Sequence, residues 1–436
     1  MRFLNTDGIF LMLLLLTILH SFFINSWWTR TPLIRYCFTK RKQVSKKPLF
    51  IRLAQPTYGA MILKRNNIQV VGMEYLSELK PPFLVMANHA HTFDPFFISS
   101  ASPVHIRWVA GAYLFKMRGM RSMMEKWIGA IAKQQGRSDL FTIRAISESL
   151  KQGDIVGIFP EGTRTWDGEP AGFDEAIAKL VKIFKVPIVL INLEGVYGLQ
   201  PRWAEKKRKG SAILRVLPPV HTDVIDQLSV HELYEFIKEK LYYSYRSWQD
   251  EMQFDYSSKR AVEGVEKILY LCPDCHATST IHSKGNQITC THCSLTMELD
   301  SHDKLHTIQG KTSFEDIAAW HSWEREYSAS SEGTQLVFPP DKGVLFQTAD
   351  ERHLKRLSKD FTLSLEHDGI RLKERSGKEY LMAFADIQSM IINAKNTVEL
   401  YHHHTLYRIR IHKRGCILKY VEAYQRDKLT QKGAIS

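Results

Sequence analysis

The chain has 436 residues, 44% of them hydrophobic and 24% charged, so it buries a sizeable core in about two or three domains and is not a disordered chain. Its 59 Lys and Arg against 46 Asp and Glu give a net charge of +13, which favours anionic partners: phospholipid head groups, nucleic acid or a polyanionic cofactor. Four of the six cysteines form two close pairs, a spacing more typical of metal ligation in a reducing compartment than of a disulfide framework.

The first predicted element is a membrane anchor over residues 1–30. Residues 9–24 (IFLMLLLLTILHSFFI) are almost entirely apolar, and a helix rising ~1.5 Å per residue spans roughly 30 Å over such a run. The juxtamembrane segment 31–54 is basic, so the positive-inside rule places everything after residue 30 in the cytoplasm. A cleaved signal peptide is disfavoured because the basic residues follow the apolar run, and a helix lying in the interface remains an alternative.

Residues 55–225 alternate short apolar runs with helical patterns. The predicted strands are 68–71, 83–87, 106–110, 155–159, 188–192 and 212–217. The predicted helices are 95–101, 121–128, 140–151 and 173–184. This order predicts an α/β domain with a layered mixed sheet flanked by helices.

A polar cluster follows the second predicted strand, in the sequence FLVMANHAHTFD (83–94). Open α/β sheets place reacting groups just past the carboxyl ends of their strands. A turn can bring the carboxylate of Asp94 to one ring nitrogen of His89, while the other nitrogen takes a proton from a substrate hydroxyl. The spacing alone is weak evidence, because His221 and Asp226 have the same separation and are interpreted as part of a surface loop.

A second strand end leads into the sequence FPEGTR (159–164), at what should be the same edge of the sheet. Glu161 supplies a carboxylate there, Gly162 allows close approach of the backbone to a ligand, and Arg164 suits bidentate recognition of phosphate. For FPEGTR alone, the structural alternative is a turn with a Glu–Arg ion pair. The pairing with the first motif favours a ligand site.

Together, NHAHTFD and FPEGTR resemble the motifs of the glycerol-phosphate and lysophosphatidate acyltransferase family, over residues 55–225. The resemblance implies the glycerolipid acyltransferase fold, with His89 as catalytic base and Asp94 as its orienting partner. It also implies that the acceptor is bound by Asn88, Glu161, Gly162, Thr163 and Arg164. The family transfers a fatty acyl group directly from acyl-CoA or acyl carrier protein, which agrees with the absence of a Ser or Cys nucleophile beside His89.

One position departs from the family pattern. Gln135 stands where the family usually carries an arginine, and Lys133 or Arg137 is a possible substitute. This departure concerns the identity of the acceptor more than the acyl transfer.

Two neighbouring segments each allow more than one interpretation. The basic run 202–209 is either a site for substrate phosphate or anionic lipid or a solvated loop. The segment 113–127 is an interfacial helix, a lining for the acyl chain or ordinary core packing.

The segment 226–270 is predicted to be helical, and a cysteine module follows at 271–300. Two CxxC pairs, separated by 14 residues, match the ribbon in which four thiolates hold one tetrahedral zinc: Cys272, Cys275, Cys290 and Cys293. A closed four-thiolate site leaves no position for substrate, so the zinc is predicted to be structural. His276 and His292 are alternative ligands.

Residues 301–345 are polar and predicted to be an irregular linker. From 346 to 436 alternating strands, at 361–367, 369–374, 379–384, 397–403 and 406–413, precede a helical 420–429. This pattern predicts a small β-barrel or sandwich closed by one helix. The run His402, His403 and His404 is interpreted as a hairpin turn rather than a metal site.

The sequence therefore predicts a membrane-bound O-acyltransferase of phospholipid biosynthesis. Its partners are membrane phospholipid, a lysophospholipid acceptor, most simply 1-acylglycerol-3-phosphate, and acyl-CoA or acyl carrier protein. His89 removes the acceptor hydroxyl proton as the oxygen attacks the thioester carbonyl, while backbone donors hold the oxyanion.

The sequence also allows two alternatives to the acyltransferase function. A nucleic-acid-binding module would use the cysteine ribbon and the net charge, but a ribbon tethered to a bilayer has little access to a chromosome, so no nucleic acid partner is expected. A lipid-binding regulator would keep the fold without the catalysis, and the change at Gln135 keeps that alternative open.

Overall fold

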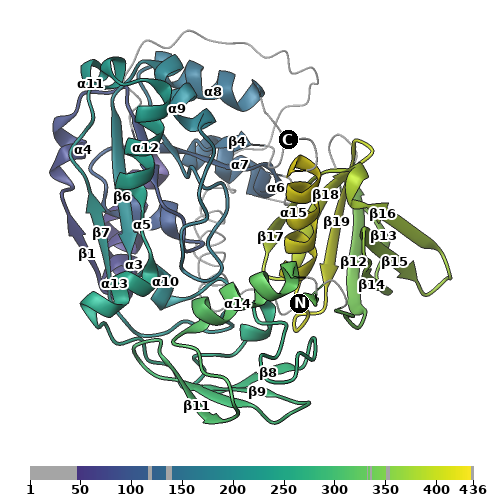
Figure 1. Cartoon of the computed structure of the whole chain (residues 1–436). Coiled ribbons are helices and arrows are strands. Elements are labelled where there is room, and N and C mark those ends of the chain that lie inside the picture. The colour runs from purple at the N-terminus through teal and green to yellow at the C-terminus, as the bar shows by residue number, and fades with distance from the viewer. Residues whose placement is uncertain are drawn as a thin grey trace, which may run out of the picture. The chain divides into compact units, whose positions relative to one another are not determined.

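A computed structural model describes residues 47–115, 120–133, 140–330, 332–333, 336–349 and 354–433 (Figure 1). The predicted anchor at 1–30 and the larger part of the basic segment 31–54 lie outside these residues. Gln135 and Arg137 also lie outside them. Within the described ranges, no helix combines the length and the apolar character needed to cross a bilayer.

The first sheet has seven strands in the order β1-β7-β6-β2-β5-β3-β4, and only the pair β6 and β7 is antiparallel. The strands are β1 (Ile68–Val71), β2 (Leu84–Ala87), β3 (Ile106–Gly111), β4 (Ile131–Lys133), β5 (Ile155–Ile158), β6 (Ile188–Glu194) and β7 (Ala212–Val216). The mixed α/β sheet predicted from the sequence is confirmed. The sequence missed only β4, whose three residues are too few to show a period.

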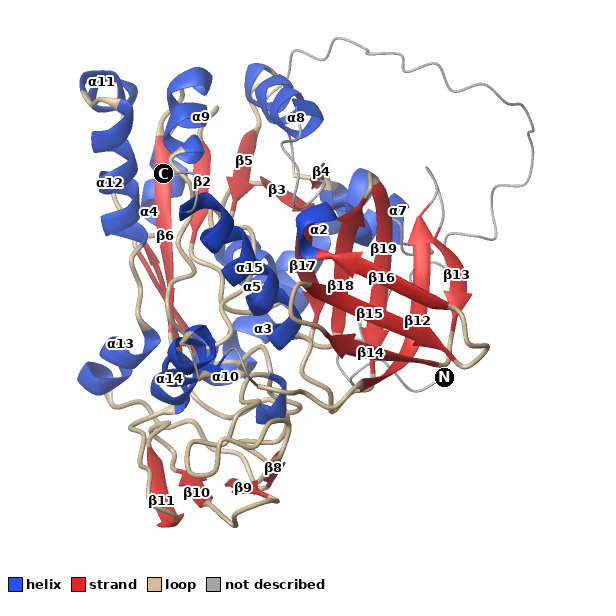
Figure 2. Ribbon diagram, turned by 45° about the vertical axis from the view of Figure 1, so that its right-hand side comes forward, coloured by secondary structure: helices blue, strands red, loops and turns tan. Residues whose placement is uncertain are grey.

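Two cores cover the two faces of this sheet. Alternate residues of β2 face opposite sides, so Phe83, Val85 and Ala87 join one core and Leu84 and Met86 the other. The first face packs against α3 (Ala60–Arg65), α5 (Asp94–Ala101) and α10 (Val196–Leu199), and the second against α8 (Leu140–Lys151), α9 (Ala176–Phe184) and α12 (Val230–Leu241) (Figure 2). A central strand buried on both faces must be a continuous apolar run, as this one is.

The remaining helical elements of the α/β part are short. They are α2 (Leu49–Ala54), η2 (Gln55–Gly59), α4 (Glu74–Glu78), α6 (Ala112–Phe115), α7 (Met120–Ser122), η3 (Met123–Ile128), α11 (Thr222–Gln227) and α13 (Tyr245–Met252). The segment 113–127 supplies Phe115 and Met124 to a small core cluster, so part of it is ordinary packing. The helical prediction for 226–270 holds only as far as α13; beyond it the chain is irregular apart from η4 (Val265–Lys267).

A small antiparallel sheet of four strands follows, in the order β11-β10-β9-β8. Its strands are β8 (Ile281–Lys284), β9 (Gln287–Cys290), β10 (Thr296–Leu299) and β11 (Leu305–Gln309). The stretch 301–345, predicted as an irregular linker, instead contains β11, the helix α14 (Ile317–Ala329) and the start of β12. The reason is that α14 buries two ionisable residues, His321 and Glu324, so its buried face does not look apolar in the sequence.

The C-terminal part is one antiparallel sheet of eight hydrogen-bonded strands, and residues from both ends of its strand order share one core with the C-terminal helix (Figure 1). The elements are β12 (Asp341–Ala349), β13 (Leu354–Ser358), β14 (Phe361–Leu365), β15 (Gly369–Glu374), β16 (Glu379–Ala383), η6 (Phe384–Asp386), β17 (Ile387–Ala394), β18 (Thr397–His402), β19 (Thr405–Ile411) and α15 (Leu418–Gly433). Along β12 the partner on one side changes from β14 to β13, which splits that side of the sheet. His403 and His404 have positive φ between β18 and β19, so the predicted hairpin turn is confirmed.

Candidate functional site

Two neighbouring parallel strands bring the two motifs to one edge of the first sheet. β2 pairs with β5 in parallel, so the loops after both strands begin side by side. The backbone N–H of His89 donates to Glu161 Oε1 at 3.0 Å, and the N–H of Thr165 donates to the His89 carbonyl at 2.9 Å. The juxtaposition predicted for NHAHTFD and FPEGTR is therefore present in the structure.

His89 and Asp94 form a hydrogen-bonded pair. His89 Nδ1 lies 2.8 Å from Asp94 Oδ2, and that oxygen also accepts from the N–H groups of Ala90 and His91, each at 2.8 Å. A carboxylate only accepts, so Nδ1 carries the proton and Nε2, which has no hydrogen bond to the described residues, presents its lone pair. Asp94 is fully buried at the first position of α5, where the helix dipole favours a negative charge.

His221 and Asp226, which have the same separation in the sequence, do not form such a pair. His221 caps the short helix α11 and Asp226 lies on that helix, and both side chains are exposed. No hydrogen bond joins them in this described part of the chain. Spacing alone therefore does not make a dyad; the loop after a buried strand does.

An aromatic stack fixes the plane of the imidazole. The His89 ring stacks on Phe159 at 4.2 Å between ring centroids, and Phe159 stacks on Trp108 at 4.9 Å. Gly157 makes room for this stack, since a Cβ there would lie 2.5 Å from the Trp108 ring. Sequence reasoning missed Trp108 and Phe159, although the position of Phe159 directly before the PEGTR turn was the available signal.

Burial and two nearby arginines set the protonation of His89. Burial lowers the pKa of His89, the hydrogen bond and charge of Asp94 act in the opposite direction, and the positive charges of Arg164 and Arg202 lower it further. An imidazole with a lowered pKa is neutral near neutral pH, as a general base must be. Burial raises the pKa of Glu161 to about 7, so this carboxyl is only partly ionised there.

The residues of the second motif have distinct surroundings. Arg164 Nη1 donates to Thr92 Oγ1 at 2.5 Å, which links the two motifs. Thr163 Oγ1 accepts a hydrogen bond of 2.9 Å from Arg202. Gly162 is exposed with φ of 68°, and nothing lies within 4 Å of an added Cβ, so the turn rather than a close neighbour requires glycine.

Several polar groups of the first loop are already hydrogen-bonded. Both ends of the Asn88 amide pair with the backbone of Leu193, so this side chain fastens the loop to β6. The backbone N–H groups of His89, Ala90 and His91 are already taken by Glu161 and Asp94. These three N–H groups therefore already have carboxylate acceptors.

His91, between the two members of the dyad, is a packing residue. It is buried, its Nδ1 accepts from the Phe93 N–H at 3.0 Å, and its ring stacks on Phe97 at 5.4 Å. Burial lowers the pKa of His91 to about 4, so it stays neutral.

The basic run 202–209 is not simply a solvated loop, since Arg202 and Arg208 are both buried. Arg208 forms an ion pair with Asp303, whereas Arg202 binds backbone carbonyls and a hydroxyl.

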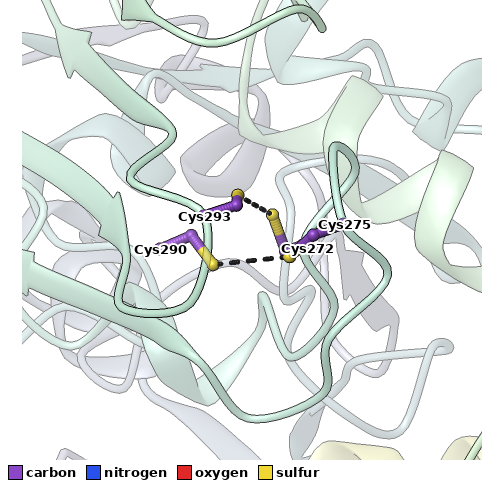
Figure 3. A group of neighbouring side chains, drawn as sticks. All are labelled: Cys272, Cys275, Cys290 and Cys293. Atoms are coloured by element: carbon purple, nitrogen blue, oxygen red, sulfur yellow. Dashed lines mark hydrogen bonds between the residues drawn. The ribbon is translucent and has the colours of Figure 1, made fainter.

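The four predicted zinc ligands converge (Figure 3). Cys272 and Cys293 have sulfur atoms 3.5 Å apart, Cys275 and Cys290 have sulfur atoms 3.8 Å apart, and all four sulfurs lie within 4.8 Å of one another. Sulfurs about 2.3 Å from a tetrahedral zinc have such separations, so the donor set fits this ion. His276 Nδ1 instead lies 3.0 Å from the Tyr327 hydroxyl, and His276 is not part of the cluster.

Residues 67–194 match the family model described as acyltransferase. The match begins just before β1 and ends with β6, so it contains both motifs. Over these residues the α/β part is therefore similar to acyltransferase domains.

Curated relatives share this region and bear one activity in their names. The 1-acyl-sn-glycerol-3-phosphate acyltransferase of Saccharomyces cerevisiae is 24% identical over 181 residues, 40% of this chain and 58% of the yeast protein. A chloroplastic 1-acyl-sn-glycerol-3-phosphate acyltransferase of Arabidopsis thaliana is 24% identical over 165 residues, 37% of this chain and 46% of that protein. The Bacillus subtilis enzyme of the same name is 26% identical over 158 residues, 36% of this chain and 75% of its own length.

The chain thus spans about half the length of the yeast and Arabidopsis relatives. Among solved structures, the 1-acyl-sn-glycerophosphate acyltransferase from Thermotoga maritima matches with a TM-score of 0.40 and 22% identity, over 48% of this chain and 81% of that chain.

Proposed function

We propose that this protein is an O-acyltransferase that moves a fatty acyl group from a thioester, acyl-CoA or acyl carrier protein, to the free hydroxyl of 1-acylglycerol-3-phosphate. The observation that carries the proposal is the hydrogen bond of 2.8 Å between His89 and buried Asp94, beside the loop that holds Arg164. The family match over 67–194 and the names of the relatives support the same chemistry.

The reaction follows from the free lone pair of His89. Nε2 takes the proton of the acceptor hydroxyl as its oxygen attacks the thioester carbonyl, and Asp94 stabilises the resulting imidazolium through Nδ1. When the C–S bond breaks, the thiolate takes the proton back from Nε2, which regenerates the neutral base. The products are the ester, here a phosphatidic acid, and the free thiol.

The test is transfer of a labelled acyl group by membranes carrying the full chain, with a panel of lysophospholipids and glycerol phosphate as acceptors. His89→Ala is expected to reduce the rate by about 10² to 10⁴, the usual loss for a general base. His221→Ala, on the exposed helix α11, is the matched control and should leave the rate unchanged. Equal damage from the two variants would refute the assignment of the base.

Two further parts of the proposal concern the rest of the chain. The four cysteines would hold one structural zinc ion, which supplies a fixed cross-link between the two CxxC turns and takes no part in acyl transfer. Metal analysis of the purified protein should find zinc in a one-to-one ratio, and reduced thiols without zinc would contradict it. The sequence of residues 9–24 and its basic flank support a single membrane anchor with the catalytic domain on the cytoplasmic side, testable by protease protection.

A further inference from the structure

The C-terminal sheet reaches the loop of the second motif through one buried arginine. Arg202 is 2% exposed; its Nη1 donates to Thr163 Oγ1 at 2.9 Å and to the Arg164 carbonyl at 2.8 Å. Its Nη2 donates to the carbonyl of Ile392, in β17, at 2.6 Å. One guanidinium therefore fastens the PEGTR turn to a strand that lies 190 residues beyond Arg202 in the chain.

A lysine from the turn between β17 and β18 lies at the same place. Lys395 donates to the carbonyl of Ala204, two residues after Arg202. Burial, with a smaller contribution from the positive charges of Lys267 and Arg164, lowers the pKa of Lys395 to about 8, while Glu205 opposes this shift. The ammonium group thus lies within the electrostatic reach of the motif arginine.

These cations have no acidic partner. In the described ranges no ion pair is formed by Arg164, Arg202 or Lys395, whereas Lys267 pairs with Glu205 at 2.7 Å. Arg208, from the same loop as Arg202, pairs with Asp303. Arg208 and Lys267 are thus neutralised, whereas Arg164, Arg202 and Lys395 have no ion-pair partner among the described residues. For Arg202, which is buried, this is costly unless an anion completes the site.

Unused hydrogen-bond donors point the same way. Arg202 Nε is buried with no partner among the described residues. Arg164 has one hydrogen bond, to Thr92, and several further N–H groups. A shortage of acceptors beside three unpaired cations is suited to a group with several anionic oxygens, such as a phosphate.

We propose that the C-terminal sheet completes the acceptor site: through Arg202 and Lys395 it joins Arg164 in a cationic cluster that receives the phosphate group of the acyl acceptor. In this arrangement Arg202 is a positioning residue, which holds the Thr163–Arg164 backbone against β17. Lys395 is a specificity-determining residue that favours acceptors with an exposed phosphate. The proposal rests on the proposed function only in naming the acceptor.

The first experiment measures kinetics of the full chain in membranes, with Lys395→Met against Lys359→Met, an exposed lysine before β14, as matched control. Lys395→Met is expected to raise the KM for 1-acylglycerol-3-phosphate about tenfold or more, because one charge-assisted hydrogen bond is lost, with kcat changed less than about twofold. The KM for the acyl donor should not move. A rise in the donor KM alone would assign the cluster to the phosphates of CoA and overturn the proposal.

The second experiment separates this inference from the reaction itself. Binding of sn-glycerol 3-phosphate is measured by calorimetry on the His89→Ala chain, with and without Lys395→Met. Binding should weaken about tenfold with Lys395→Met and return to near its former value with Lys395→Arg, which restores the charge. Equal binding by all three chains, or an equal loss in Lys359→Met, would sink the proposal even if His89 proves to be the base. If His89→Ala keeps full transfer activity, the proposed mechanism is wrong. The effect of Lys395→Met on the binding of sn-glycerol 3-phosphate would still test the phosphate site independently.

Discussion

Replacing Asp94 with asparagine removes one negative charge while leaving the hydrogen-bond geometry in place. Three donors converge on Asp94 Oδ2, from the ring of His89 and from the backbone at Ala90 and His91. The amide oxygen must take that position, because an NH2 group there would face three donors. His89 therefore keeps its acceptor and its tautomer, and the amide nitrogen falls at the position of Oδ1, which is buried without a partner.

The size of the effect follows from what is lost. Hydrogen bonds to charged groups contribute roughly 1.5–3 kcal/mol, and the imidazolium formed in the transition state loses that charge-assisted share. Asp94→Asn should therefore lower kcat by about 10- to 150-fold, less than the roughly 10² to 10⁴ expected for His89→Ala. The unpartnered buried amide should also lower the free energy of unfolding by about 1–3 kcal/mol.

The assay is thiol release against pH by membranes carrying each variant. Asp94 raises the pKa of His89, so its loss lowers that pKa and shifts the acid limb of the rate profile to lower pH, where the base now stays neutral. Asp226→Asn, on the exposed helix α11, is the control and should change neither rate nor profile. An Asp94→Asn variant as inactive as His89→Ala, or an acid limb that moves to higher pH, would refute the reasoning.

Three other predictions concern the stack, the cysteines and the charge of the site. Gly157→Ala places a methyl group against Trp108 and should lower the free energy of unfolding by about 1–3 kcal/mol in denaturant titrations. The value of kcat should also fall, because the plane of the His89 ring shifts. An unchanged denaturation midpoint would contradict this prediction. Cys290→Ser should lose zinc on metal analysis and melt at a lower temperature, whereas Cys416→Ala, whose buried thiol lies outside the cluster, should keep its zinc. The pH profile of kcat reports the enzyme with bound substrate, and that of kcat/KM reports the free enzyme. The pKa of the acid limb should be higher in the profile of kcat, because a bound anion offsets the positive charges that lower the pKa of His89. The reverse order would exclude such an anion.

The first sheet and the dyad were predictable because their signals are local. Apart from β4, each strand of this sheet is a short apolar run between turn residues, and β1 and α8 begin and end where the sequence pattern placed them. His89 and Glu161 meet because each follows a strand, and neighbouring parallel strands end at one edge. No long-range information is needed for either step.

The elements that sequence reasoning missed depend on partners far along the chain. The buried face of α14 contains His321, whose ring nitrogens lie 2.8 Å from Asp167 and 2.9 Å from Glu422. These two carboxylates raise the pKa of His321 to about 10, so it is buried as a cation. A polar pattern in the sequence suggests a linker when the counter-charges lie about 100 residues or more away, as they do here.

The net charge of +13 also acquires a location only in the structure. Arg208 and Lys267 are buried and are neutralised by nearby acids, whereas Arg164, Arg202 and Lys395 form no ion pair in the part of the chain that the structure describes. Two of these unpaired cations are also those that lower the pKa of His89. Under the proposal above, the positive charges that attract the phosphate of the acceptor also keep His89 neutral before the acceptor binds. Once a phosphate offsets that field, the affinity of Nε2 for a proton rises, so the imidazole becomes a stronger base when the acceptor hydroxyl is in place.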